Sequence, residues 1–274
     1  MSESNPQLTQ THRHPSAGNL NSRPVLLRVG DVPMQLPPVS YPHGVDPSVD
    51  QVQFGPDLDD TAIGRLIGSA GPMEGRRVLV LGCGAGASAI ALARKGARVI
   101  AVEASTARLT QARAAAEVAD VRIEFHHSDL ADLAFLRGDS IELVIAVYSL
   151  AGVQDLGRVF RQLHRIMKPE AALVLSLPHP FSMMLEADEE ELTSPYLTRS
   201  SWADQVIPWR AGGDEGVSHV HQISDLFMTL IRSNFRVDAM VEPPAVQGQR
   251  SVHWSPLAEW LPSTVIVRAR KQGT

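Results

Sequence analysis

The stretch Val78–Ser88, VLVLGCGAGAS, decides the fold. It begins as an uninterrupted apolar run, breaks into glycines at Gly82, Gly84 and Gly86, and leads into an alanine-rich segment. A buried strand, a glycine turn and a helix in this order are typical of α/β proteins that hold a nucleotide-type cofactor. Glycine suits the turn because it lets the backbone bend tightly and approach a ligand closely. The stretch therefore predicts a cofactor site at the end of a buried strand.

The glycine spacing fits two kinds of cofactor. Gly82, Gly84 and Ala87 satisfy the G-x-G-x-x-G/A pattern of dinucleotide sites. Gly82, Gly84 and Gly86 satisfy the G-x-G-x-G pattern of methyl-donor sites equally well. The motif alone leaves both open, so other parts of the chain have to decide between them.

The whole chain has the composition of an ordinary soluble globular protein. It has 274 residues, of which 44% are hydrophobic and 20% are charged. The formal net charge of −5 offers no basic surface, so nucleic acid is not an expected partner. No apolar run approaches the length of a membrane helix, and the polar N-terminus lacks the apolar core of a secretory signal. We expect a cytoplasmic protein without a membrane partner.

Outward from the glycine stretch, apolar strands alternate with helices. We expect strands at 76–82, 97–103, 121–127, 140–149 and 171–178, and helices at 87–96, 105–119 and 155–169. A further helix at 219–235 and two late strands at 236–244 and 263–271 follow. Continuously apolar strands separated by helices predict a doubly wound, mostly parallel α/β sheet covered on both faces. The late pair predicts an antiparallel C-terminal edge.

Composition also suggests the domain organisation. Residues 1–24 are polar and predict a mobile tail, and residues 25–74 predict a wrapping segment that includes a helix at 57–71. The cofactor-binding domain is expected at 75–274. Within it, residues 179–218 lose the regular pattern, and we expect them to form a lid over the substrate.

In an open parallel sheet, ligands lie outside the carboxyl ends of the strands. The expected strands present there, in chain order, Gly82, Cys83, Gly84, Glu103, His127, Ser128, Asp129, Tyr148, Ser149 and His179. Glu103 lies where a carboxylate can accept both hydroxyls of a ribose, and Asp129 where it can accept from an adenine amino group. The alternatives are a solvated turn or a helix cap for each carboxylate, and a small space-filling residue for Cys83.

With these residues assembled, the chain resembles the class I S-adenosylmethionine-dependent methyltransferases of the small-molecule type. The glycine stretch resembles the first motif of the family, VIAVEAS (99–105) the second, and HHSDLADL (126–133) the third. The resemblance covers about 75–178 well and the late strands more loosely, and it implies a Rossmann-like, seven-stranded sheet. A nicotinamide enzyme would explain the glycines and Glu103, but neither the third motif nor the late strands.

The resemblance implies S-adenosyl-L-methionine as cofactor and a set of residues that bind it. The glycine turn, with Cys83 inside it, would cradle the methionine end and the ribose, and Glu103 would hold the ribose hydroxyls. The adenine would lie against Ala104, Asp129 and Leu130, and the sulfonium against Val147 and Tyr148. The family also implies in-line methyl transfer, which is expected here toward a small-molecule acceptor.

Two departures from the family pattern stand out. Val80 occupies a position where many relatives carry an acidic residue that orients the donor's amino group, and Lys168–Ala171 replaces the usual Lys-Pro-Gly-Gly. A binding protein without catalysis, which Val80 alone supports, stays open as an alternative. A methyltransferase acting on protein or nucleic acid, which would need a large docking surface, also stays open. A homodimer is also left open.

The residues of catalysis and acceptor binding are less sharply indicated. His179, directly after the fifth strand, is the first candidate for a general base, with a stiffened Pro-flanked turn as the alternative. Tyr148 would orient the acceptor or close over the donor, with core packing as its alternative. Candidate lid or pocket residues are Tyr41, Phe54, Trp202 and Trp209. No metal is expected, because His219 and His221 lack a clear third ligand.

Overall fold

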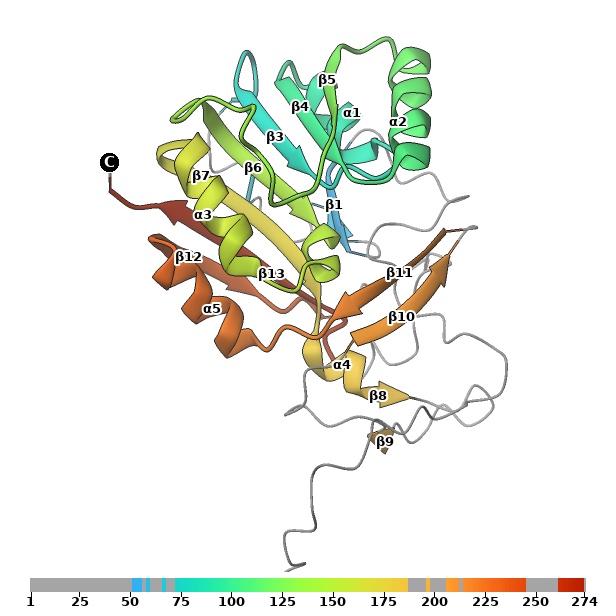
Figure 1. The fold of residues 1–274 in the computed structure, drawn as a ribbon, viewed down its shortest axis with the longest axis vertical. Helices are drawn as coiled ribbons and strands as arrows, with labels where there is room; N and C mark the ends of the chain where they lie inside the picture. Colours follow the sequence, from blue (N-terminus) through green and yellow to red (C-terminus); the bar gives the residue numbers. More distant parts are fainter. Residues whose placement is uncertain are drawn as a thin grey trace, which may run out of the picture. The chain divides into compact units, whose positions relative to one another are not determined.

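A seven-stranded sheet forms the centre of the computed structural model (Figure 1). The structure describes residues 51–55, 58–59, 66–67, 72–186, 196–197, 206–211, 214–244 and 261–273. The strands are β3 (Arg77–Leu81), β4 (Arg98–Glu103), β5 (Ile123–His127), β6 (Ile141–Val147), β7 (Met167–Pro178), β12 (Phe235–Val241) and β13 (Thr264–Lys271). Their order across the sheet is β12-β13-β7-β6-β3-β4-β5.

The direction of the strands confirms the predicted fold class. Strands β3 to β7 pair in parallel, whereas β13 runs antiparallel to both β7 and β12. The chain moves outward from β3 to β4 and β5 on one side and then returns to place β6 and β7 on the other side. The carboxyl ends of β3 and β6 therefore flank the switch point, where ligands of such sheets bind.

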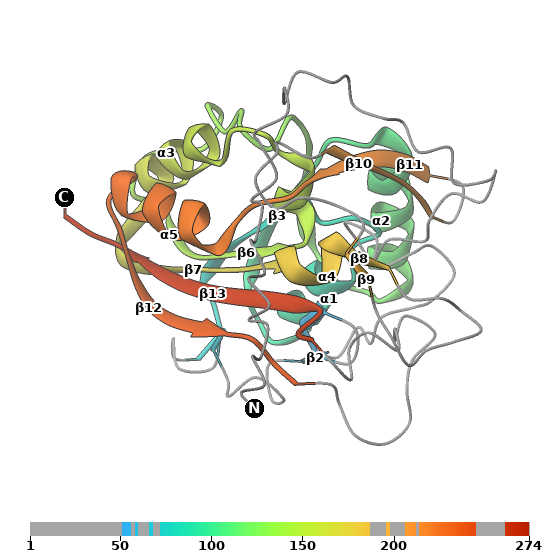
Figure 2. The ribbon, with the colours of Figure 1, turned by 90° about the horizontal axis from the view of Figure 1, so that it is seen from below.

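Helices cover both faces of the sheet (Figure 2). On one face, α3 (Leu156–Ile166) and α5 (Ile223–Arg232) pack against each other and share an apolar cluster with Leu79 and Leu81. On the other face, α1 (Ala87–Arg94) shares a second cluster with Val78 and Val80. This division follows from the alternation of side chains along β3. Helix α2 (Thr106–Val118) contacts β4, β5 and α1.

The strands and helices predicted from residue 76 onward are present, and two of the helices differ clearly at an end. The helix expected at 155–169 ends at Ile166, and β7 begins directly at Met167. Proline at 169 favours an extended residue before it and has no N–H for a helix, and the register with β6 shifts across this start. The helix expected at 219–235 begins only at Ile223.

The helix expected at 57–71 is wrong where it can be checked. Leu58–Asp59 forms strand β2, which pairs with β1 (Gln53–Gly55), and residues 66–67 form a turn. The other residues of that stretch lie outside the described ones, as does the expected tail at 1–24. Among the described residues, no helix is long and apolar enough to cross a membrane.

The irregular region between β7 and α5 contains short elements. These are α4 (Pro180–Met184), the pair β8 (Leu185–Glu186) and β9 (Tyr196–Leu197), and the hairpin β10 (Val206–Ala211) and β11 (Asp214–His219). The side chain of Ile207 joins the apolar cluster that holds α3, and β11 contacts η2 (Ser149–Gly152), the short turn after β6. The hairpin is thus anchored beside the switch point. The domain boundaries themselves stay predictions.

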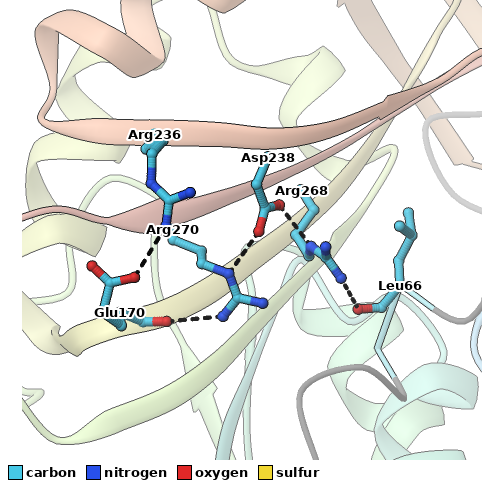
Figure 3. A network of polar contacts seen from close by, with 6 residues as sticks. All are labelled: Leu66, Glu170, Arg236, Asp238, Arg268 and Arg270. Atoms are coloured by element: carbon cyan, nitrogen blue, oxygen red, sulfur yellow. Dashed lines mark hydrogen bonds and ion pairs between the residues drawn. The ribbon is translucent and has the colours of Figure 1, made fainter.

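A network of charged residues ties the antiparallel strands to the rest of the sheet (Figure 3). Asp238 on β12 accepts hydrogen bonds from Arg268 (2.7 Å) and Arg270 (2.6 Å) on β13. Arg268 also donates to the backbone carbonyl of Leu66 and Arg270 to that of Glu170, each over 3.1 Å. Burial by itself would raise the pKa of the Asp238 carboxyl, but both arginines outweigh it and hold the pKa below its usual value.

Candidate functional site

The glycine turn after β3 has a conformation that favours glycine. Gly82, Gly84 and Gly86 have φ values of 72°, 55° and 96°. At Gly82 space is also short, because a Cβ there would lie 2.1 Å from the Cβ of Ser149. The N–H of Gly82 donates to the carbonyl of Val102 on β4 over 2.8 Å. The turn is therefore held tightly between the ends of β4 and β6.

Glu103 ends β4 and fixes the glycine turn from the other side. Its side chain is buried, with one oxygen accepting from the N–H of Gly84 (2.8 Å) and the other from the N–H of Ser105 (2.9 Å). Each carboxylate oxygen has two lone pairs, so each can accept one more hydrogen bond. Ala104, the next residue, is exposed. The result is a pre-oriented carboxylate that can serve two neighbouring hydroxyls.

The end of β5 adjoins this edge. Asp129 is exposed, and one of its carboxylate oxygens accepts from the N–H of Ala131 over 2.7 Å, which closes a local turn. Leu130 lies beside the glycine turn, with its Cδ1 3.5 Å from where a Cβ on Gly82 would stand. The ring of His127 hydrogen-bonds the carbonyl of Ala104 over 2.9 Å. The ends of β3, β4 and β5 therefore form one continuous rim.

Cys83, inside the glycine turn, has no reactive character. Burial raises the pKa of its thiol to about 12, and the negative charge of Glu103 adds to the effect. A thiol that stays protonated is a poor nucleophile. This agrees with its interpretation as a small filling residue.

Two residues at the end of β6 have different surroundings. The ring of Tyr148 is buried, and its hydroxyl hydrogen-bonds the hydroxyl of Thr264 on β13. Burial raises the pKa of the Tyr148 phenol far above its usual value, although the bond to Thr264 opposes this. Ser149 faces the glycine turn, and its hydroxyl donates to the carbonyl of Leu81 over 2.5 Å. Tyr148 therefore stays protonated near neutral pH and cannot take up a proton.

His179 follows β7 directly and is also buried. Its Nδ1 accepts from the N–H of Phe181 over 3.2 Å, so Nε2 carries the proton and donates to Glu242 over 3.0 Å. Both ring nitrogens are therefore engaged. To act as the general base predicted from the sequence, His179 would first have to open one of these hydrogen bonds.

A comparison with known protein families agrees with this interpretation of the strand ends as a cofactor site. Residues 78–170, from β3 to the start of β7, match a methyltransferase domain. The matched region includes the glycine turn, Glu103, Asp129 and the end of β6.

Individual proteins agree with the family match. A demethylmenaquinone methyltransferase of Clavibacter sepedonicus is 36% identical over 104 residues, which are 38% of this chain and 42% of that protein. A ubiquinone biosynthesis O-methyltransferase of Azorhizobium caulinodans is 29% identical over 105 residues, 38% of this chain and 41% of that protein. The chain thus matches less than half the length of these curated relatives.

A solved structure extends the similarity beyond the matched segment. The S-adenosylmethionine-dependent methyltransferase of Mesorhizobium loti is 27% identical, with a TM-score of 0.61 over 73% of this chain and 93% of that one. The matched segment and the fold are those of a class I S-adenosylmethionine-dependent methyltransferase domain. The resemblance noted in the sequence is confirmed, and it implies S-adenosyl-L-methionine as the cofactor.

The residues at the strand ends fit this cofactor. The glycine turn carries no side chain at 82, 84 and 86, and the buried Glu103 carboxylate keeps acceptor capacity for ribose hydroxyls. The structure brings together the predicted residues Gly82, Cys83, Gly84, Gly86, Glu103, Ala104, Asp129, Leu130, Val147 and Tyr148 at adjoining strand ends. Their individual contacts with the cofactor stay predictions.

The predicted acceptor residues are less well placed. Tyr41 and Trp202 lie outside the described residues, and Trp209 lies on β10, where only its backbone is described. Phe54 is fully buried in the apolar cluster that holds α1. This position gives Phe54 a packing role, and its part in acceptor binding stays a prediction. Among the described residues, no group of His, Cys, Asp or Glu is arranged to hold a metal ion.

Two residues of the site were missed in the sequence. Thr264 pairs with Tyr148, and Glu242 pairs with His179. Thr264 reaches the site because β13 pairs with β7 and places Thr264 opposite Pro178. No local motif marks Thr264 or Glu242. Ser149 was placed at the strand ends from the sequence, but its close approach to Gly82 was not foreseen.

Proposed function

We propose that the protein transfers a methyl group from S-adenosyl-L-methionine to a small-molecule acceptor. The observation that carries this proposal is the hydrogen bond between Glu103 and Gly84, which joins a ribose-type carboxylate to the glycine turn at the switch point. When bound, the cofactor supplies an electrophilic methyl carbon on a sulfonium. The chain's own task is then to bind both reactants and align them, since proximity and orientation account for much of such catalysis.

Each part of the rim has a role in this proposal. Glu103 holds the ribose hydroxyls, and Asp129 with Leu130 borders the adenine. Tyr148 has a protonated phenol, so it can shape the pocket or donate a hydrogen bond. His179, fixed by Phe181 and Glu242, positions the chain at the end of β7.

Two observations support a small acceptor over a macromolecular one. The net charge of −5 gives no general attraction for nucleic acid. The names of the two curated relatives, a demethylmenaquinone methyltransferase and a ubiquinone biosynthesis O-methyltransferase, point to small-molecule acceptors. A cytoplasmic location and a homodimer, both considered from the sequence, stay predictions.

The proposal is tested with donor labelled in its methyl group. The protein is incubated with this donor in separate reactions. Each reaction contains one class of acceptor: small phenols, amines, thiols, protein or nucleic acid. We expect label in a small-molecule fraction and one molecule of demethylated donor for each methyl group transferred. Label in protein or nucleic acid would contradict the proposed acceptor class, and loss of donor without any methylated product would contradict methyl transfer.

A further inference from the structure

His221 has a buried ring nitrogen that no other group uses. The residue lies between β11 and α5, and β11 contacts η2, which follows directly after β6 (Figure 1). Within the part of the chain that the structure describes, Nε2 of His221 is buried and has no hydrogen-bond partner. This nitrogen therefore belongs to the same edge of the sheet as the rim described above.

The free ring nitrogen suits one tautomer for proton transfer. The backbone of Val153 and of Leu150 lies next to the imidazole and acts to raise its pKa, against the larger effect of burial. With its proton on Nδ1, the neutral ring has a lone pair on Nε2, the nitrogen without a hydrogen-bond partner among the described residues. An imidazole with this free lone pair has the arrangement of a general base.

A second unpartnered group lies close by in the chain. The hydroxyl of Ser218 on β11 is buried and, among the described residues, also has no hydrogen-bond partner. Ser218 stands opposite Ile207 in the hairpin, and Ile207 packs into the cluster that contains Leu150. Unpaired buried polar groups destabilise a fold, so two of them on one short stretch indicate a place where a ligand completes the hydrogen bonds.

The charge state of His221 suits a base. Burial lowers the pKa of its imidazole, and the neighbouring His219, whose ring centre lies 6.2 Å away, adds to this. The backbone of Val153 and Leu150 and the carboxylate of Asp225 oppose the shift without cancelling it. The ring is therefore neutral at pH 7. His179, by contrast, has both nitrogens engaged.

We propose that Nε2 of His221 accepts the proton of a hydroxyl group on the acceptor, which makes the protein an O-methyltransferase. The inference rests on the proposed function. In the step, the acceptor oxygen gives its proton to Nε2 and forms a bond to the methyl carbon with a lone pair. The bond between carbon and sulfur breaks, and its electron pair stays on sulfur, which becomes a neutral thioether.

A hydroxyl fits this place better than an ammonium group. The surroundings of His221 already disfavour a positive charge, and a neutral hydroxyl enters without adding one. A phenol or enol is the best match, because its acidity is closer to that of an imidazolium than the acidity of an alkyl alcohol is.

The test uses the variant His221→Asn with His219→Asn as its matched control. Asparagine keeps an N–H near the position of Nδ1 but removes the base at Nε2. Binding of the demethylated donor, S-adenosylhomocysteine, is measured by calorimetry, and methyl transfer is measured across pH with phenol, catechol and 4-nitrophenol as acceptors. We expect both variants to bind the demethylated donor within about threefold of the wild type.

Transfer to phenol and catechol should fall by about 100-fold or more in His221→Asn and by only a few-fold in His219→Asn. The loss should be much smaller for 4-nitrophenol above its own pKa, since that acceptor needs no base. Equal losses for ionised and neutral phenols, or a fully active His221→Asn, would overturn the inference. Donor binding without transfer to any phenol would overturn the hydroxyl class, whereas absence of donor binding in the wild type would overturn the proposed function itself.

Nitrogen NMR of the wild-type protein gives a second test that needs no acceptor. We expect His221 to carry its proton on Nδ1 and to stay neutral below pH 6.5, the usual midpoint for histidine. A proton on Nε2 at neutral pH would overturn the inference.

Discussion

The proposed donor and acceptor sides of the site are built in different ways. On the proposed donor side, Gly84 and Glu103 are 19 positions apart and joined by one hydrogen bond. On the proposed acceptor side, His179 and Glu242 are 63 positions apart, and Tyr148 and Thr264 are 116 apart. The first is made of consecutive strand ends, whereas the second depends on how distant strands pair. Residues of the first can be found from local spacing, and residues of the second only from the tertiary structure.

Substitutions on the proposed donor side should therefore have the largest effects on stability and donor affinity. A substitution remote from both sides should have a smaller effect, and one on the proposed acceptor side the smallest.

Gly82→Ala should have the largest effect. Its Cβ would clash with Ser149 at a φ of 72°, and strain and overpacking together should lower the free energy of unfolding by about 2–5 kcal/mol. Denaturant unfolding measures this loss, and calorimetry should show donor binding largely abolished. The control is Gly75→Ala, which has a similar φ of 71° but nothing within 4 Å of the new Cβ. It should cost only about 1–2 kcal/mol and leave donor binding unchanged. Equal effects of the two variants would contradict the close packing at the switch point.

Glu103→Ala should weaken donor binding by about 1.5–3 kcal/mol, or roughly 10- to 150-fold, because it removes a charged acceptor. Glu142→Ala is its counterpart at the opposite end of the sheet, where that carboxylate accepts from the N–H of Arg77 over 2.9 Å. Glu142→Ala should lower stability but leave donor affinity unchanged. Calorimetric titration with the demethylated donor distinguishes the two variants. An unchanged affinity in a folded Glu103→Ala protein would mean that Glu103 does not bind the ribose.

Asp238→Asn should cost about 1.5 kcal/mol of stability at pH 7 through weaker hydrogen bonds to Arg268 and Arg270, with no change in donor affinity. The pKa of Asp238 is lowered in the folded state, so its contribution is present above the unfolded value near 3.9 and is lost as pH falls through the folded pKa. Unfolding curves of wild type and variant should therefore converge below about pH 4. A difference that persists at pH 2 would assign the effect to packing.

Tyr148→Phe should have the smallest effect, about 1 kcal/mol, from loss of the hydrogen bond to Thr264. Because the pKa of Tyr148 is raised in the folded state, its contribution is complete below about pH 10 and is lost as pH rises above that value. The variant should lack this alkaline loss in denaturation experiments, and its donor affinity should change less than about threefold. A tenfold loss of donor affinity would show that the hydroxyl of Tyr148 contributes to binding the donor.

The sequence was sufficient for most of the fold. Apolar strands alternating with helices indicated the parallel sheet, and the late pair indicated the antiparallel edge that β12 and β13 form. The end of α3 was misplaced because the pairing of β6 with residues 167–178 turns Met167 into a strand residue. The start of the helix expected at 57–71 was misjudged at residues 58–59, because helical spacing of apolar residues does not show that Leu58 pairs with Gly55.

The sequence was less informative about the site. The glycine turn and Glu103 were found because their spacing is a local signal. His221 was considered only as half of a metal site, since its role depends on the contact between β11 and η2. Likewise, nothing near His179 in the sequence shows that Glu242 and Phe181 engage both of its ring nitrogens.

The most direct test of the account is a calorimetric titration of the purified protein with S-adenosylmethionine, S-adenosylhomocysteine and NAD(H) in parallel. The account predicts micromolar binding of the first two at one site and no heat from NAD(H). Binding of NAD(H) alone would contradict this. It would mean that Gly82, Gly84 and Ala87 form the dinucleotide pattern, and that Gly86 does not mark a methyl-donor site.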